Sequence, residues 1–90
     1  MKYRFRTTPA FRKALTKLTR GQKESAKRAF TIFKADPFDP RLKTHKIHSL
    51  SARFGQTIHS VWVEGDLRAV FYLEGDLVMS VDIGTHAIYR

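Results

Sequence analysis

The first hydrophobic pattern in the chain has the period of a strand and then changes to that of a helix. Basic and aromatic residues alternate from Lys2 to Thr7, which indicates a half-buried strand. Thr8 follows as a helix cap with Pro9 in the first helical position, where the missing N–H of proline is not needed. Apolar residues then recur at helical spacing, namely Phe11, Ala14, Leu15 and Leu18.

A second helix is predicted directly after the first. Thr19 and Gln22 have the spacing of a capping box, and the helix should end at Asp36 because the residue before Pro37 resists helical angles. Its inner face consists of small and aromatic residues, Ala26, Ala29, Phe30 and Phe33. The two helices are therefore expected to form a hairpin whose outer faces carry most of the lysine and arginine residues.

The second half of the chain predicts an antiparallel meander. Three apolar segments, Ile58 to Val63, Leu67 to Leu73 and Leu77 to Ile83, are separated twice by the tripeptide Glu-Gly-Asp, at positions 64–66 and 74–76. The expected fold class is α+β. Its order is an N-terminal strand, an α-helical hairpin and a meander of three to four strands.

The registers of the two hairpins decide which side chains face the core. If the second hairpin has a three-residue loop, one apolar face carries Ala69, Phe71, Leu73, Leu77, Met79, Val81 and Ile83. The opposite, mixed face then carries Arg68, Val70, Tyr72, Val78, Ser80 and Asp82, and we expect that face to be functional. In the first hairpin, a two-residue loop puts His59 on the face of Arg68 and Trp62 in the core. A three-residue loop reverses both placements.

Length and composition indicate one small domain, residues 1–90. A chain of 90 residues buries roughly 60 to 65% of its unfolded surface, so one modest core is expected. It has no cysteine, which excludes disulfides and thiolate metal sites. No apolar run approaches the ~20 residues that span a bilayer, and no apolar stretch follows the basic start, so neither a membrane segment nor a signal peptide is expected. A soluble cytoplasmic protein is the resulting prediction.

The charge balance indicates a partner rich in phosphate or carboxylate groups. Lysine and arginine total 17 against 8 acidic residues, which gives a formal charge of +9. Such an excess is typical of nucleic-acid-binding domains. We therefore expect nucleic acid as the main partner and an acidic protein as a second, compatible one.

The chain ends on residues that can carry chemistry. The last predicted strand continues into Gly84, which we expect to use backbone angles that other residues avoid and so to turn the chain off the sheet. His86, Tyr89 and Arg90 follow directly. Packing alone does not require a histidine, a phenol and a guanidinium so close together.

These features resemble the RelE/ParE superfamily of toxins from bacterial type II toxin-antitoxin modules. The resemblance spans essentially the whole chain and rests on the element order, on Asp36-Pro37, on Val-Glu-Gly-Asp-Leu-Arg at 63–68 and on Ile-Gly-Thr-His-Ala-Ile-Tyr at 83–89. Gly-Thr-His near the end is similar to the YafQ-type branch of ribosome-dependent mRNA interferases. The resemblance implies metal-independent cleavage of mRNA in the ribosomal A site, with no cofactor or small-molecule ligand, and a cognate acidic antitoxin as inhibitor.

The resemblance also implies which residues act. His86 matches the catalytic histidine of the YafQ-type ending and is assigned as general acid, with Arg68 as the clamp on the phosphate in the transition state. His45 and Asp66 are the candidates for the general base, and Tyr89 is expected to stack on or orient a base. The expected substrate-binding residues are Lys43, Lys46, Arg53, His59 and Arg90.

One position departs from the pattern, because Trp62 aligns with the meander histidine of YafQ. His59 lies three residues earlier, near the place of a catalytic lysine in RelE-type toxins, and either substitutes for it or is structural. Two other functions stay open from the sequence. One is a ParE-like toxin that binds and poisons DNA gyrase, and the other is a degenerate toxin that only binds antitoxin or regulates an operator.

Overall fold

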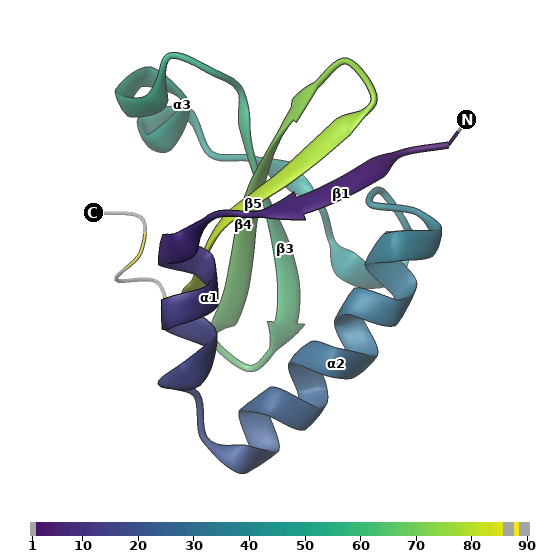
Figure 1. The fold of residues 1–90 in the computed structure, drawn as a ribbon, viewed down its shortest axis with the longest axis vertical. Helices are drawn as coiled ribbons and strands as arrows, with labels where there is room; N and C mark the ends of the chain where they lie inside the picture. Colours follow the sequence, from purple (N-terminus) through teal and green to yellow (C-terminus); the bar gives the residue numbers. More distant parts are fainter. Residues whose placement is uncertain (1, 86–87, 89–90) are drawn as a thin grey trace.

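The chain folds into a five-stranded sheet flanked by helices on both faces (Figure 1). This computed structural model describes residues 2–85 and 88. Its elements are, in chain order, β1 (Arg4–Thr7), α1 (Pro9–Thr16), α2 (Arg20–Ala35), the 3-10 helix η1 (Pro40–Leu42), β2 (His45–Lys46), α3 (His48–Phe54), β3 (Ile58–Glu64), β4 (Leu67–Glu74) and β5 (Leu77–Gly84). The predicted α+β class and order of elements are confirmed.

The sheet has the strand order β1-β5-β4-β3-β2. β3, β4 and β5 form the predicted antiparallel meander, and β2 adds antiparallel to β3. β1 pairs in parallel with β5, from Arg4 opposite Leu77 to Thr7 opposite Ser80. After β1 the chain passes through the helical hairpin and η1 to β2 at the opposite edge of the sheet, and the meander then brings β5 back beside β1.

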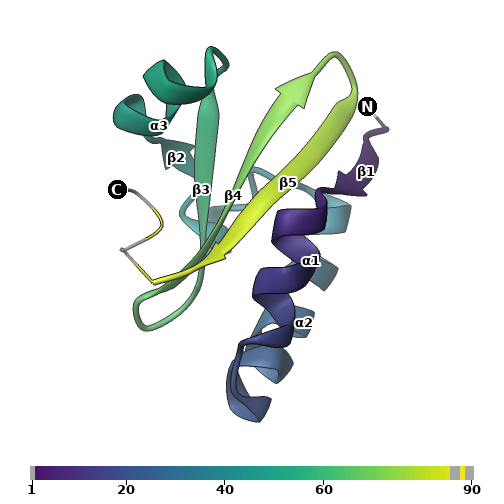
Figure 2. The ribbon, with the colours of Figure 1, turned by 60° about the vertical axis from the view of Figure 1, so that its left-hand side comes forward.

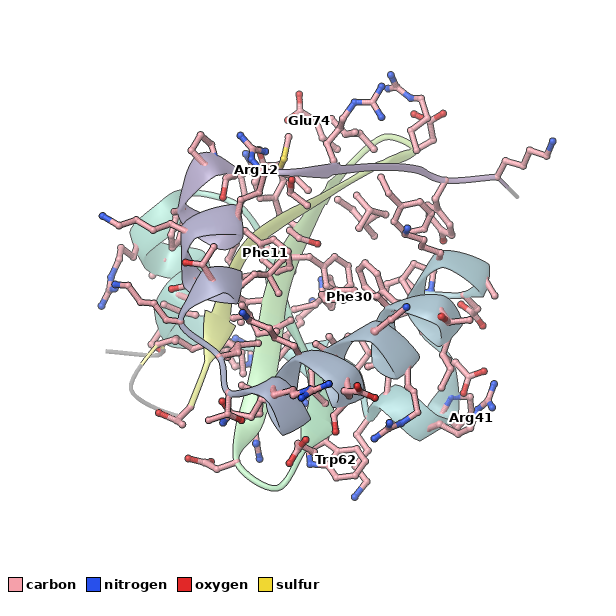
Figure 3. All side chains as sticks on the ribbon, turned by 60° about the horizontal axis from the view of Figure 1, so that its bottom comes forward. Phe11, Arg12, Phe30, Arg41, Trp62 and Glu74 are labelled. Atoms are coloured by element: carbon pink, nitrogen blue, oxygen red, sulfur yellow. The ribbon has the colours of Figure 1, made fainter. Side chains whose placement is uncertain are left out.

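The two faces of the sheet have separate apolar clusters. Figure 2 shows α1 and α2 on one side of the sheet and α3 on the other. We call these the hairpin face and the α3 face. The hairpin face holds the larger cluster, in which Phe11 and Phe30 meet edge to face at 5.5 Å between α1 and α2 (Figure 3). The α3 face holds a smaller cluster built on Leu50, Ile58, Val70 and Val81.

Both long helices begin at the predicted caps. Thr8 Oγ1 accepts a hydrogen bond from the Phe11 N–H at 3.1 Å. Thr19 and Gln22 form the predicted capping box, since Thr19 Oγ1 accepts from the Gln22 N–H at 3.1 Å and Gln22 Oε1 accepts from the Thr19 N–H at 2.9 Å. These bonds satisfy backbone donors that a helix start leaves without partners.

The register predicted for the second hairpin is wrong. Glu74 pairs with Leu77, so the loop has two residues, and Gly75 takes a positive φ of 62° that suits such a turn. Val78 and Ser80 consequently lie on the hairpin face, whereas Leu77, Met79 and Val81 lie on the α3 face. A bulge in β5 opposite Val70 and Phe71 then resets the alternation. Because of this bulge, Ile83 returns to the hairpin face and Asp82 to the α3 face, as predicted.

The first hairpin combines a short loop with the side-chain placement expected of a longer one. Glu64 pairs with Leu67 across two residues, but a bulge between Trp62 and Glu64 adds one residue to β3. As a result Trp62 lies opposite Arg68, while His59 packs on Phe71 on the hairpin face. The bulge therefore decides the alternative that the sequence left open.

The segment between the two halves contains structure that the sequence pattern did not predict. β2 has only two residues, and α3 begins after Ile47 without a side-chain cap. Gly55 ends α3 with a φ of 68°. None of the helices in the described part of the chain is long and apolar enough to cross a membrane.

Candidate active site

Arg68 has the geometry of an anion-binding side chain. It is the second residue of β4, and its side chain is 21% exposed. Its Nη1 atom lies 3.6 Å from Asp66 Oδ1, which is an ion pair but too long for a hydrogen bond. Within the described residues, this buried nitrogen has no hydrogen-bond acceptor. Because buried donors in native proteins usually have acceptors, this guanidinium is a candidate to bind an anion.

The chemically rich ending starts beside Arg68. Gly84, the last residue of β5, is the backbone partner of Arg68. A Cβ at Gly84 would lie 2.7 Å from Ile88 Cγ2, and its φ is not positive, so glycine is needed for close approach and not for unusual angles. This corrects the reason that the sequence suggested. His86, Tyr89 and Arg90 lie outside the described residues.

Trp62 and Lys43 extend the site across β3. The Nζ of Lys43 lies over the Trp62 ring at 4.9 Å from its centroid. The Trp62 indole N–H donates to the Gly65 carbonyl at 3.0 Å, which ties it to the turn that carries Asp66. Lys43, Trp62, Arg68 and Asp66 are thus linked in one row. The sequence indicates that Trp62 departs from the YafQ pattern and leaves its face open, because the pattern does not mark the β3 bulge that sets this face.

His45 shares a face with Arg68 but not a contact. His45 pairs with Ser60, and Ser60 pairs with Val70, so all three side chains lie on the α3 face with Arg68. Strand spacing and rise put the His45 and Arg68 backbones about 12 Å apart. His45 is exposed, and its Nδ1 lies 2.9 Å from the Lys43 carbonyl oxygen.

His59 lies on the other face, in an aromatic environment. Its ring stacks on Phe71 at 5.2 Å and meets the edge of Phe38 at 5.4 Å. Burial, and then the charges of Lys46 and His45, lower the pKa of His59 below its usual value. Lys46 is its partner on β2. The structure therefore separates His59 and Lys46 from Arg68.

Arg53 belongs to the α3 face. It lines a cavity of about 410 Å³ between α3 and the sheet, together with Val70, Asp82 and Ile88. The described residues contain no group of three or more His, Cys, Asp or Glu side chains placed to hold a metal ion. The groups gathered on or beside this face are thus cations, the carboxylates of Asp66 and Asp82, and an imidazole, a set suited to binding and proton transfer at a phosphodiester.

Solved structures with the same architecture identify the fold. No protein-family model matches the sequence, and no curated protein matches it. A chain of the E. coli DinJ-YafQ toxin-antitoxin complex superposes with a TM-score of 0.74 at 16% identity, over 98% of this chain and 97% of that one. The chain has the RelE/YafQ-type toxin fold.

Two further structures agree with this fold. YafQ from E. coli strain BL21(DE3) gives a TM-score of 0.71 at 17% identity, covering 97% of each chain. A chain of the archaeal RelE-RelB complex from Pyrococcus horikoshii OT3 gives 0.71 at 14% identity, over 94% of this chain and 96% of that one. All three matches cover 94% or more of this chain, so the RelE/YafQ-type fold accounts for nearly its whole length.

Proposed function

We propose that this chain is the toxin of a type II toxin-antitoxin module and an endoribonuclease that cuts mRNA on the ribosome. The RelE/YafQ-type fold supports this proposal, and solved structures with this fold include one described as a toxin-antitoxin complex. Fold alone does not determine activity, so the site must carry the argument.

The observation that carries the proposal is the half-buried guanidinium of Arg68. Its Nη1 lacks a hydrogen-bond acceptor among the described residues, and its backbone partner is Gly84, where the Gly-Thr-His ending begins. A phosphodiester bound here would supply the missing acceptor and a negative charge. The negative charge that develops on phosphorus during cleavage would be stabilised by the same group.

The reaction uses the substrate's own 2′-hydroxyl. A base removes its proton, the 2′-oxygen attacks phosphorus, and the 5′-oxygen of the next nucleotide leaves as it receives a proton. We assign His86 as the acid, Asp66 or His45 as the base, and Arg68 as the clamp on the phosphoryl oxygens. Tyr89 stacks on or orients a base. Asp66 is close enough to act in concert with Arg68, since the two form an ion pair at 3.6 Å.

Binding to the ribosome would use the basic side chains outside this site. Cations are exposed along the two helices of the hairpin, at Arg12, Lys13, Lys17, Arg20, Lys23, Lys27, Arg28 and Lys34. With a formal charge of +9, the chain is suited to contact ribosomal RNA phosphates with these helices while the α3 face holds the message. The same charge suits an acidic antitoxin as the neutralising partner.

Cleavage of a translated mRNA in a purified translation system tests this function. We expect cuts within codons only when ribosomes are present, and we expect co-expression of the adjacent small open reading frame to restore growth of cells that produce the chain. An mRNA that stays intact while DNA gyrase is trapped on DNA would instead assign the ParE-like function.

A further inference from the structure

The outer edge of β3 is open beside Trp62. In the described part of the chain, β2 covers β3 only opposite His59 and Ser60. Beyond this point a groove of about 370 Å³ lies between α2, η1 and β3, and its walls include Arg28, Arg41, Leu42 and Trp62. Figure 3 shows Trp62 at the rim of the molecule near the β3–β4 turn.

Lys43 is held over Trp62 by an uncommon backbone conformation. Its φ of 51° and ψ of 40° are left-handed, and no other non-glycine residue in the described chain has a positive φ. Such a conformation costs about 1 kcal/mol or more and tends to occur at functional sites. Here it follows η1 directly and accompanies the placement of the ammonium at 4.9 Å from the indole centroid.

We propose that Trp62 is a stacking platform for a nucleobase of single-stranded RNA next to the phosphate bound by Arg68. The base takes the place of the Lys43 ammonium over the indole, and Lys43 then pairs with a phosphate of the same strand. Because Trp62 lies directly opposite Arg68 on the adjacent strand, one RNA strand can run from the Arg68 phosphate to the edge of β3.

The chemistry of the groove favours RNA over a protein segment. An aromatic face next to cations is the common design for single-stranded nucleic acid, because every base has a face that can stack. Arg41 is paired with the Asp39 carboxylate in two hydrogen bonds of 3.0 Å each. Arg28 donates to the neutral Ser25 hydroxyl at 3.0 Å, and neither Arg28 nor Lys43 has a carboxylate partner among the described residues, so these two are the cations for a phosphate.

Trp62 fluorescence measures this binding directly, because Trp62 is the only tryptophan of the chain. A short 2′-O-methyl RNA oligonucleotide, which cannot be cleaved, is titrated into the full-length protein. We expect quenching that saturates, and a binding constant that falls with salt at roughly 0.7 log units per phosphate contact. An acidic peptide of similar length and charge is the comparison ligand and should leave the fluorescence unchanged.

Variants separate stacking from structure. Trp62→Ala should weaken oligonucleotide binding about 5- to 150-fold, measured by fluorescence anisotropy of a labelled oligonucleotide, whereas Trp62→Phe should retain most of it. Phe keeps an aromatic face but lacks the indole N–H that donates to the Gly65 carbonyl. If both variants lose the same oligonucleotide affinity, Trp62 acts by holding the β3–β4 turn and not by stacking. Lys43→Gln should keep the quenching and lower the salt slope by roughly 0.7. Lys2→Gln is the matched control and should change neither, because Lys2 is exposed just before β1, at the edge of the sheet farthest from β2.

The inference rests on the proposed function only for its substrate class, and the two can fail separately. If the protein cuts translated mRNA but the oligonucleotide does not change its fluorescence, the stacking platform is wrong and the nuclease stands. If the oligonucleotide quenches Trp62 while translated mRNA stays intact, the platform stands and the nuclease is wrong. If the acidic peptide quenches Trp62 and the oligonucleotide does not, the groove binds a protein segment and the RNA proposal is wrong.

Discussion

Two buried nitrogen atoms have no hydrogen-bond partner within the described chain, Arg68 Nη1 and His59 Nδ1. They lie on opposite faces of the sheet and have opposite surroundings. Arg68 is next to a carboxylate and the start of the Gly-Thr-His ending, whereas His59 packs against the rings of Phe71 and Phe38. The first environment suits a charged ligand and the second keeps an imidazole neutral. These surroundings support a packing role for His59 and the proposed phosphate-binding role for Arg68.

The pKa of His59 makes stability depend on pH. Burial lowers this pKa in the folded chain below the unfolded value of about 6.5. The unfolded chain then binds more protons, so the stability from neutral His59 is present above about pH 6.5 and is lost as pH falls toward the folded pKa. Thermal unfolding from pH 7.5 to 5 should show a smaller loss of Tm for His59→Phe than for wild type. Equal losses would contradict the assignment.

Gly84 tests whether the Ile88 side chain lies tightly against the end of β5. Gly84→Ala puts a methyl group 2.7 Å from Ile88 Cγ2, so we expect a loss of about 1–3 kcal/mol in unfolding free energy by urea denaturation. Gly21→Ala is the matched control, because its Cβ meets nothing within 4 Å and lies in a helix. The control should be neutral or gain about 0.4–1 kcal/mol. A tolerated Gly84→Ala would contradict the tight contact.

At the scale of elements, the sequence predicts features set by neighbouring residues, such as helix starts, but not features set by distant residues, such as strand register. Caps and proline positions fixed the starts of α1 and α2, because the hydrogen bonds involved connect residues three apart. Hairpin register depends on bulges at Val63 and Val81, which the sequence pattern does not mark. The parallel β1–β5 pair joins residues more than 70 positions apart. Such contacts leave no periodic pattern.

The capping box of α2 is expected to contribute measurably to stability. Thr19→Ala removes the acceptor for the Gln22 N–H and should cost about 0.5–2 kcal/mol of unfolding free energy. Thr31→Ala is the control within the same helix, because the Thr31 hydroxyl only donates to the Lys27 carbonyl, which α2 already engages. Urea denaturation of both variants should give a loss for Thr19→Ala alone. Equal effects would mean that the cap is not a stabilising feature.

At the scale of the whole molecule, charge and site are arranged on different surfaces. The exposed cations of α1 and α2 lie on the side of the sheet opposite α3, while Arg68 and His45 lie on the α3 face (Figure 2). One surface can therefore contact ribosomal RNA while the other contacts the message. Substitutions on each surface can therefore test ribosome binding and mRNA cleavage separately.

Ribosome affinity should depend on the helices and not on the site. We expect binding to 70S ribosomes to weaken with salt at roughly 0.7 to 0.9 log units per phosphate contact. Lys23→Gln with Lys27→Gln should reduce that slope, and Arg68→Ala should leave it nearly unchanged. Sedimentation with ribosomes at several salt concentrations measures both. A binding constant that does not change with salt would contradict an electrostatic interface.

The sequence predicts candidate site residues by their identity but indicates little of their geometry. Arg68, Asp66 and His45 follow from short motifs, and the structure puts Arg68 and His45 on one face. His59 and Trp62 could not be assigned, because the β3 bulge decides which face each occupies. The roles of His86, Tyr89 and Arg90 stay predictions.

The most direct test of the central claim is the rate of mRNA cleavage by Arg68 variants in a purified translation system. Arg68→Ala should lose about 100- to 1000-fold in rate with its fold intact, and Arg68→Lys should retain part of the activity because it keeps the charge without the planar fork. Arg4→Ala is the matched control, since Arg4 forms an exposed ion pair with Asp76 at 3.0 Å beside the other hairpin turn. It should cleave like wild type. Wild-type cleavage by a folded Arg68→Ala variant would contradict the account.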